Sequence, residues 1–209
     1  MVRPLDTATQ TAVRDRSRVV RVNLVWITAK TGAGSDISFG FTDYGEDITT
    51  NVVDGETGST VSRSFYGDEA PIVRIDPIPM KIGLGIETVQ VVLNPLHAAV
   101  ETMFRGNDIR NAPVQIYRGM LDPDSGLFAS NPRCRHLGQI NEAPVETAAV
   151  GGTSSITLKV VSHTRELTRT STLKWSDESQ RLRSDDRFLR YVGNTEDVPW
   201  WWGEESGTN

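Results

Sequence analysis

The chain has 209 residues, a single cysteine and a net charge of −5 at pH 7. One cysteine excludes an internal disulfide framework and a four-cysteine metal cluster. No apolar stretch reaches the roughly 18 to 20 residues of a membrane helix, so we do not expect an integral membrane protein. The N-terminal residues lack the apolar core of a secretory signal. The negative charge argues against general nucleic-acid binding, although a local basic patch remains compatible with it.

The N-terminal half begins with a polar arm and continues as strands. Residues 1–16 lack apolar periodicity, which predicts an arm that is disordered unless a partner orders it. Residues 19–29 are rich in valine and isoleucine, which predicts a strand that is buried on both faces at its end. The turn sequence at 31–36 and a short strand at 38–41 then complete a hairpin. Residues 43–58 predict loops around one weak strand.

Strand patterns recur at roughly ten-residue spacing along the rest of the chain. In residues 86–93, Val89, Val91 and Leu93 are expected on the better buried face. Gly151 and Gly152 predict a hairpin turn. The recurrence predicts a β-barrel or β-sandwich. The further predicted strands are 60–65, 72–75, 86–93, 114–120, 136–140, 145–150 and 156–162.

One α-helix is predicted within this series, near residues 95–105. Asn94 is expected as its N-cap, Pro95 as its first residue and Gly106 as its end. Between them, helical spacing predicts a buried stripe of Leu96, Val100, Met103 and Phe104.

After residue 163 the chain becomes highly charged, and we predict two short helices, near 177–183 and 185–192. We therefore expect an N-terminal arm (1–16), a β-barrel domain (17–170) and a C-terminal extension (171–209). The extension contains three adjacent tryptophans, which one short tail cannot bury by itself. They must pack either on their own domain or on another chain.

No catalytic, metal-binding or cofactor-binding pattern stands out. Cys134 and His136 lie two residues apart, but a thiol nucleophile needs a base in hydrogen-bond reach and a third, orienting group. Residues at this spacing can share a strand face without meeting. His97, His136 and His163, the three histidines, show no spacing typical of metal ligands. We expect no enzymatic activity and no cofactor.

Four segments resemble the baseplate hub proteins of long-tailed phages and gene transfer agents. They are FGFTDYGEDI (39–48), NDIRNAPVQIYRGMLDPDSG (107–126), ITLKVVSHTRELTRT (156–170) and SDESQRLRSDDRFLRYVGNTEDVPWWWGE (176–204). The last segment is the most specific, because it keeps the order of the family's C-terminal pattern. The chain lacks the cysteine-rich C-terminal region of larger family members.

The resemblance implies a virion structural protein at the phage tail tip, made in the bacterial cytoplasm, with no catalytic residues. It implies a mainly β, tail-tube-like barrel or sandwich with one flanking α-helix and an extended, partly helical C-terminal tail. Such a hub joins the tail tube to the tip as a ring, with a homotrimer favoured and a hexamer as the alternative. The implied partners are the distal tail protein, the tip or fibre proteins, the tape measure protein and DNA passing through without sequence-specific binding.

A ring also suggests roles for individual residues. Acidic loops lining the channel would repel DNA and keep it sliding. We expect these channel-lining residues to be Glu46, Asp47, Asp54, Glu56, Asp68 and Glu69. The expected contacts between subunits are Arg181, Arg187, Phe188, Tyr191, Trp200, Trp201 and Trp202.

Two other classes remain open. One is a different tail component, either the distal tail protein or the tube protein. The other is a tail-associated cysteine peptidase, which would depend on Cys134.

Overall fold

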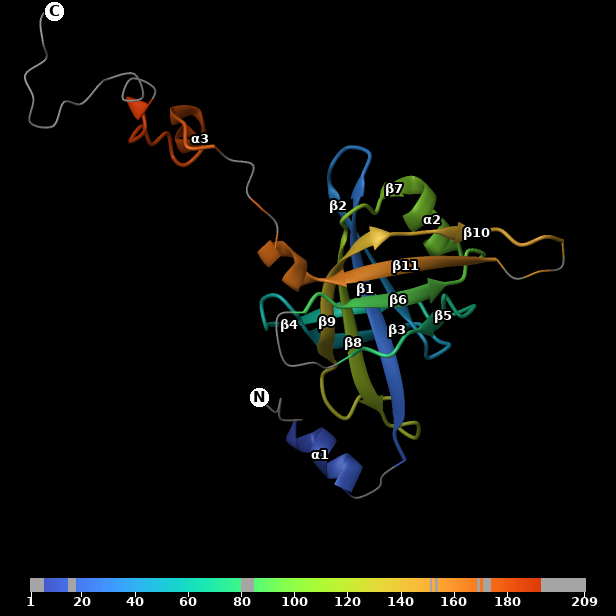
Figure 1. Ribbon diagram of the computed structural model, residues 1–209. Coiled ribbons are helices and arrows are strands. Elements are labelled where there is room, and N and C mark those ends of the chain that lie inside the picture. The colour runs from blue at the N-terminus through green and yellow to red at the C-terminus, as the bar shows by residue number, and fades with distance from the viewer. Residues whose placement is uncertain are drawn as a thin grey trace, which may run out of the picture. The chain divides into compact units, whose positions relative to one another are not determined.

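The computed structural model describes residues 6–14, 18–79, 85–150, 152, 154–168, 170 and 174–192. The chain divides into two compact units, residues 1–167 and 168–209 (Figure 1). The first unit holds helices α1 (Thr7–Arg14) and α2 (Ala98–Gly106) and all the strands, and the second holds helix α3 (Asp177–Arg181). A 3-10 helix, His163–Thr168, spans the boundary between the two units.

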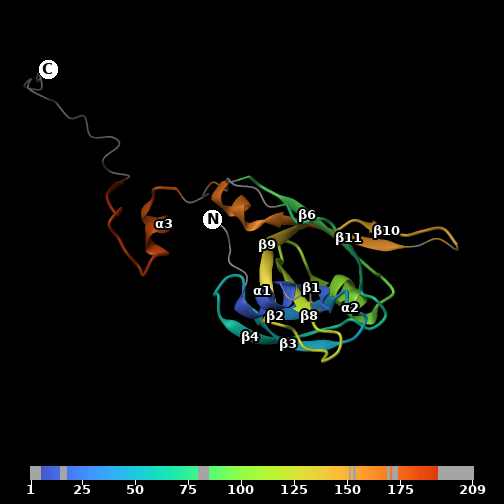
Figure 2. The ribbon, with the colours of Figure 1, turned by 90° about the horizontal axis from the view of Figure 1, so that it is seen from below.

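Within the described residues, the strands form one eleven-stranded sheet whose main path runs β2-β1-β8-β9-β11-β6-β5, with each neighbouring pair antiparallel. The sheet curls into a half-barrel (Figure 2). The fold is therefore mainly β with a short flanking helix, and this part of the predicted fold class is confirmed. The strands are β1 (Val20–Thr31), β2 (Asp36–Thr42), β3 (Ile48–Val53), β4 (Thr60–Phe65), β5 (Ile72–Ile75), β6 (Thr88–Leu93), β7 (Asn107–Asp108), β8 (Pro113–Leu121), β9 (Arg133–Glu142), β10 (Val145–Glu146) and β11 (Ser155–Ser162).

Strand β1 is buried on both faces, which confirms the prediction from its valine and isoleucine content. Val25 and Ile27 pack into the larger core, which β6, β11 and α2 complete. Leu24 packs on the opposite face, against the β3–β4 hairpin. Figure 2 shows β6 and β11 on one side of β1 and β8, and β3 and β4 on the other. Two packed layers around one strand explain why no side of it carries a continuous polar stripe.

The β3–β4 hairpin is joined to the sheet by backbone hydrogen bonds at its margins. The Tyr66 N–H donates to the Gly40 carbonyl at 2.9 Å, and the Thr42 N–H donates to the Tyr66 carbonyl at 2.8 Å. At this crossing a Cβ on Gly40 would lie 2.3 Å from the Ser64 carbonyl oxygen. Only glycine admits so close an approach of the two backbones.

Helix α2 begins later than its capping residues predict. His97 is the N-cap, and its Nδ1 accepts a hydrogen bond from the Ala99 N–H at 3.2 Å. Asn94 instead accepts from the Leu96 N–H at 3.1 Å and forms a turn before the helix, so its predicted role as N-cap was wrong. Val100 and Met103 form the buried stripe and Phe104 is partly buried beside it, but Leu96 lies before the helix and is 86% exposed, so its predicted place in the stripe was wrong.

Three other predictions need correction. The arm predicted to be disordered contains α1, whose buried Thr9 hydroxyl lies 2.7 Å from the Ser130 hydroxyl, a tertiary contact that no local pattern announces. The strand predicted at 145–150 is limited to the two residues of β10. In the second unit α3 is shorter than predicted, and residues 185–191 form turns and irregular structure instead of a second helix.

Candidate functional site

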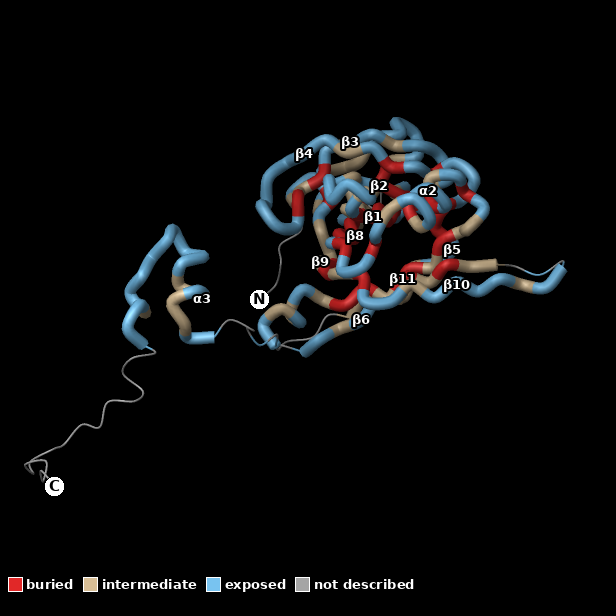
Figure 3. Tube along the Cα trace, turned by 90° about the horizontal axis from the view of Figure 1, so that it is seen from above, coloured by how far each residue is buried: buried red, intermediate tan, exposed pale blue. Residues whose placement is uncertain are grey.

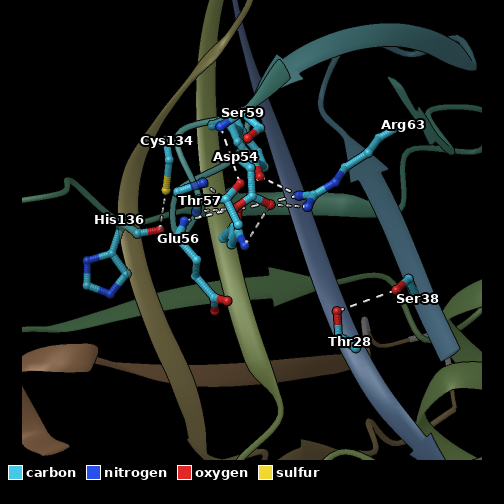
Figure 4. Close-up of polar contacts among 12 residues, drawn as sticks. Thr28, Ser38, Asp54, Glu56, Thr57, Ser59, Arg63, Cys134 and His136 are labelled. Atoms are coloured by element: carbon cyan, nitrogen blue, oxygen red, sulfur yellow. Dashed lines mark hydrogen bonds and ion pairs between the residues drawn. The ribbon is translucent and has the colours of Figure 1, made fainter. Parts of the chain in front are cut away.

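A buried polar network joins the β3–β4 hairpin to strand β8 (Figure 4). The Arg63 side chain on β4 forms an ion pair with Asp54 and donates a hydrogen bond to the Tyr117 hydroxyl. Gln115 donates to Asp54 Oδ2 at 3.4 Å, and its Oε1 accepts from the Gly55 N–H at 3.0 Å. The Asp54 and Arg63 side chains are only 9% and 10% exposed. The ion pair and hydrogen bonds of this network therefore take the place of the water molecules that both charged groups lose on burial.

Local geometry stabilises the charged form of Asp54. Burial alone would raise its pKa, but the N–H groups of Thr57 and Glu56, together with Arg63, lower it below its ordinary value. Burial raises the pKa of Tyr117 strongly, so this phenol stays protonated. The guanidinium carbon of Arg63 lies 4.7 Å from the centre of the Trp26 ring, which adds a cation–π contact.

Sequence reasoning missed this network, because Arg63 and Gln115 lie 52 residues apart. One local feature could have indicated it. Gln115 is a polar residue inside a strand whose neighbours Val114 and Ile116 are fully buried. A buried amide needs hydrogen-bond partners, so its position predicts a polar group across the core.

Cys134 and His136 do not form a thiol–imidazole pair. The Cys134 Sγ donates to the main-chain carbonyl of His136 at 3.3 Å, and Figure 4 shows the imidazole ring directed away from the sulfur. The His136 Nε2 is buried without a hydrogen-bond partner. Burial lowers the pKa of His136, although a hydrogen bond with the Val160 backbone and the Glu87 carboxylate oppose that shift. This geometry gives no support to a cysteine peptidase.

The other side chains considered for metal binding lie apart. His97 caps α2 and packs edge-on against Phe41, with ring centroids 6.3 Å apart, while His163 is exposed at the start of the 3-10 helix. Across the described ranges, no group of three or more His, Cys, Asp or Glu side chains is arranged to hold a metal ion.

The acidic residues predicted to line a channel fall into two groups. Asp47 Oδ1 accepts from the Gly67 N–H at 2.9 Å and from the Asp68 N–H at 3.3 Å, which joins the loop before β3 to the loop after β4. Glu46 and Glu69 lie in these same two loops, and all four acidic residues are exposed.

The second group lies at the opposite end of the six-residue strand β3. A strand of that length separates its two ends by about 17 to 20 Å. Glu56 is exposed there, whereas Asp54 is buried in its pair with Arg63. The expectation of an acidic, solvent-facing side chain therefore does not hold for Asp54.

The residues predicted to contact other subunits lie in the second unit. Arg187 pairs with Asp177 at 2.7 Å, and Arg181 pairs with Glu178 and Asp185 at 3.5 and 3.2 Å. The pKa of Asp177 is lowered mainly by its hydrogen bond from Arg187. Trp200, Trp201 and Trp202 lie outside the described residues.

The described part of this unit exposes five large apolar side chains, of which Val192 is the least exposed. Phe188 is 84% exposed and Trp175 86%, and Leu182 and Tyr191 are also exposed. Figure 3 shows the segment around α3 coloured mostly as exposed. These side chains are apolar surface that this part of the chain leaves in water.

No protein-family model and no curated protein matches the sequence. In the part of the chain that the structure describes, no helix is both long enough and apolar enough to cross a membrane.

Proposed function

We propose that the chain is a structural subunit of a phage tail tip, of the baseplate hub type, which assembles with copies of itself into a ring. The observation that carries the proposal is the exposed apolar surface of the second unit. Phe188, Tyr191 and Leu182 lie within residues 176–204, the segment with the most specific resemblance to the hub family. Aromatic side chains are enriched in the energetic centres of protein interfaces.

In this proposal the second unit supplies the contact between neighbouring subunits. Arg181 and Arg187 are held by acidic partners of their own unit, which orders the segment around Phe188 and Tyr191. The three tryptophans at 200–202 extend the same contact surface. Closing a ring repeats one such contact around an axis, so every subunit gains the same burial.

The exposed acidic groups would face the channel. Glu46, Asp47, Asp68 and Glu69 come together on two adjacent loops, and a like-charged rim repels the phosphates of passing DNA. Asp54 takes no part in this rim, since its charge is compensated by Arg63.

The particle mass of the purified chain tests the proposal. Light scattering is expected to give a trimer or a hexamer for the full chain and a monomer for a chain ending at residue 167. A trimer favours the hub, and a hexamer favours a distal tail or tube ring.

The double variant Phe188→Ser/Tyr191→Ser should also dissociate the particle. Leu96→Ser, which alters a leucine that is 86% exposed in the first unit, should leave the mass unchanged. A full chain that stays monomeric at its solubility limit would contradict self-assembly.

A further inference from the structure

Four arginines gather at one end of the half-barrel, on three adjacent strands of the sheet. Arg118 on β8 stands opposite Arg133 on β9, and Arg135 follows two residues later. On β1, Asn23 pairs with Arg118, and Arg21 lies two residues before Asn23. Burial lowers the pKa of Arg118, and repulsion from the positive charges of Arg21 and Arg135 lowers it further.

The acidic groups near this cluster do not balance it. Asp43 lies within range of Arg118 but is held by Asn23, which donates its backbone N–H at 2.8 Å and its side-chain amide at 2.6 Å. Asp6 on the segment before α1 approaches Arg133 only to 4.0 Å. Within the described ranges, the carboxylates that these contacts place near the four guanidinium groups are Asp6 and Asp43, in a protein whose total charge is negative.

Arg135 is the least satisfied member. Its Nε is buried and has no hydrogen-bond partner, and no ion pair to its side chain is found among the described residues. Arg118 uses its Nε on Asn23 Oδ1 at 3.1 Å. A guanidinium donor withdrawn from water without an acceptor is costly. A bound anion offsets the cost of holding this charge among other positive charges.

A cavity lies where these side chains converge, between α1 and strands β8 and β9. It has a volume of about 30 Å³, about the space that one water molecule occupies. Hydroxyl, amide and carboxylate groups complete the wall around its three arginines. The lining includes Arg118, Arg133, Arg135, Thr9, Ser130 and Asn131, together with Asp6.

The cavity shares part of its lining with a wider hollow. That hollow has a volume of about 410 Å³ and shares Asp6, Ser130, Asn131 and Arg133 with the cavity. A phosphate group can therefore place one oxygen in the cavity while its other atoms occupy the hollow. Guanidinium forks, a hydroxyl and an amide are the donors that bind tetrahedral oxyanions.

We propose that this cavity is a binding site for a phosphate group, held by Arg118, Arg133 and Arg135 beneath helix α1. The phosphate oxygens accept hydrogen bonds from the guanidinium groups and offset the repulsion among them. The site is independent of the ring contact proposed above, which lies in the other unit.

Titration calorimetry of the full chain with inorganic phosphate tests the site, with sodium chloride at matched ionic strength as the reference. We expect saturable binding of phosphate with one site per chain and no comparable binding of chloride. Arg135→Gln should weaken binding by about tenfold or more, the effect of losing one charged hydrogen-bond donor. Arg133→Gln is a second variant, and its side chain is 52% exposed, so the fold tolerates the change.

Arg105→Gln is the matched control, because Arg105 is exposed on α2 and pairs with Glu101 at 3.4 Å. It should bind phosphate like the unaltered chain. Thermal unfolding in phosphate-free buffer checks that each variant is folded. Phosphate that binds no better than chloride, or binding that survives both Arg135→Gln and Arg133→Gln, would overturn the proposal.

A single-stranded oligonucleotide, added to the phosphate-bound chain, identifies the source of the group. Displacement of phosphate by the oligonucleotide, together with weaker direct binding of the oligonucleotide to Arg133→Gln, would assign the site to a nucleic-acid backbone. Saturable phosphate binding without competition would assign it to free phosphate.

Discussion

Replacing Arg63 by methionine is expected to destabilise the first unit strongly. Methionine retains much of the length of the arginine but removes the charge that faces Asp54, Tyr117 and the Trp26 ring. The Asp54 carboxylate would then remain at 9% exposure without its cation. The same change removes the hydrogen bond between β4 and Tyr117 on β8 and leaves the contacts of Gly55 and Asp54 with Gln115 in place.

The structure sets the size of the effect. Breaking a buried ion pair by removing one partner costs about 3 to 5 kcal/mol. Asp54 keeps three neutral donors, namely the N–H groups of Glu56 and Thr57 and the amide of Gln115, which place the loss near the lower end. We therefore expect a loss of about 3 kcal/mol, equivalent to a fall in Tm of about 6 to 12 °C for a unit of this size.

Chemical denaturation of four chains measures this effect and its origin. The unaltered chain, Arg63→Met, Asp54→Asn and the double variant form a cycle, and the double variant should lose less than the sum of the single losses. Lys30→Met is the matched control, because the Lys30–Asp36 pair is about two-thirds exposed on both sides and should contribute less than about 1 kcal/mol. Equal losses for Arg63→Met and Lys30→Met, or strict additivity in the cycle, would refute the reasoning.

Two further predictions concern the sheet. Gly40→Ala should cost about 1 to 3 kcal/mol in unfolding free energy, because the new Cβ meets the Ser64 carbonyl. Gly32→Ala is the control and should be nearly neutral, since the space around Gly32 is open. Equal losses in the two variants would exclude the close approach at Gly40. Since burial lowers the pKa of His136, the unfolded chain binds more protons below pH 6.5, and stability should fall as the pH drops from there by at most about 1.4 kcal/mol per pH unit. Denaturation between pH 7.5 and 5 should show a smaller fall for His136→Gln and an unchanged fall for His163→Gln, and the opposite ranking would contradict the assignment.

Much of the secondary structure follows from local pattern. The predicted strands at 60–65 and 72–75 coincide with β4 and β5, and Val89, Val91 and Leu93 form the buried face of β6, as their alternation predicted. Alternation and turn residues act over a few positions, so they are visible in the sequence. The phage-tail role and the subunit contacts at 176–204 stay predictions that the proposed mass measurements test.

Choices between competing local patterns were decided by packing. Asn94 and His97 can both cap a helix, and His97 takes that place where its ring also packs against Phe41 and Tyr66. The arm at the N-terminus has little apolar periodicity, yet α1 lies against the sheet through Thr9. Propensity alone does not contain these contacts, because their partners are distant in the chain.

The two polar clusters belong entirely to the tertiary structure. Arg63 meets Gln115 across 52 residues, and Arg118 stands opposite Arg133 because the β8–β9 register shifts between Ile116 and Tyr117. Sequence alone determined which segments are strands and which of their faces are apolar. Strand order and register decided which charged side chains face each other, since that depends on how the curled sheet closes over its two cores.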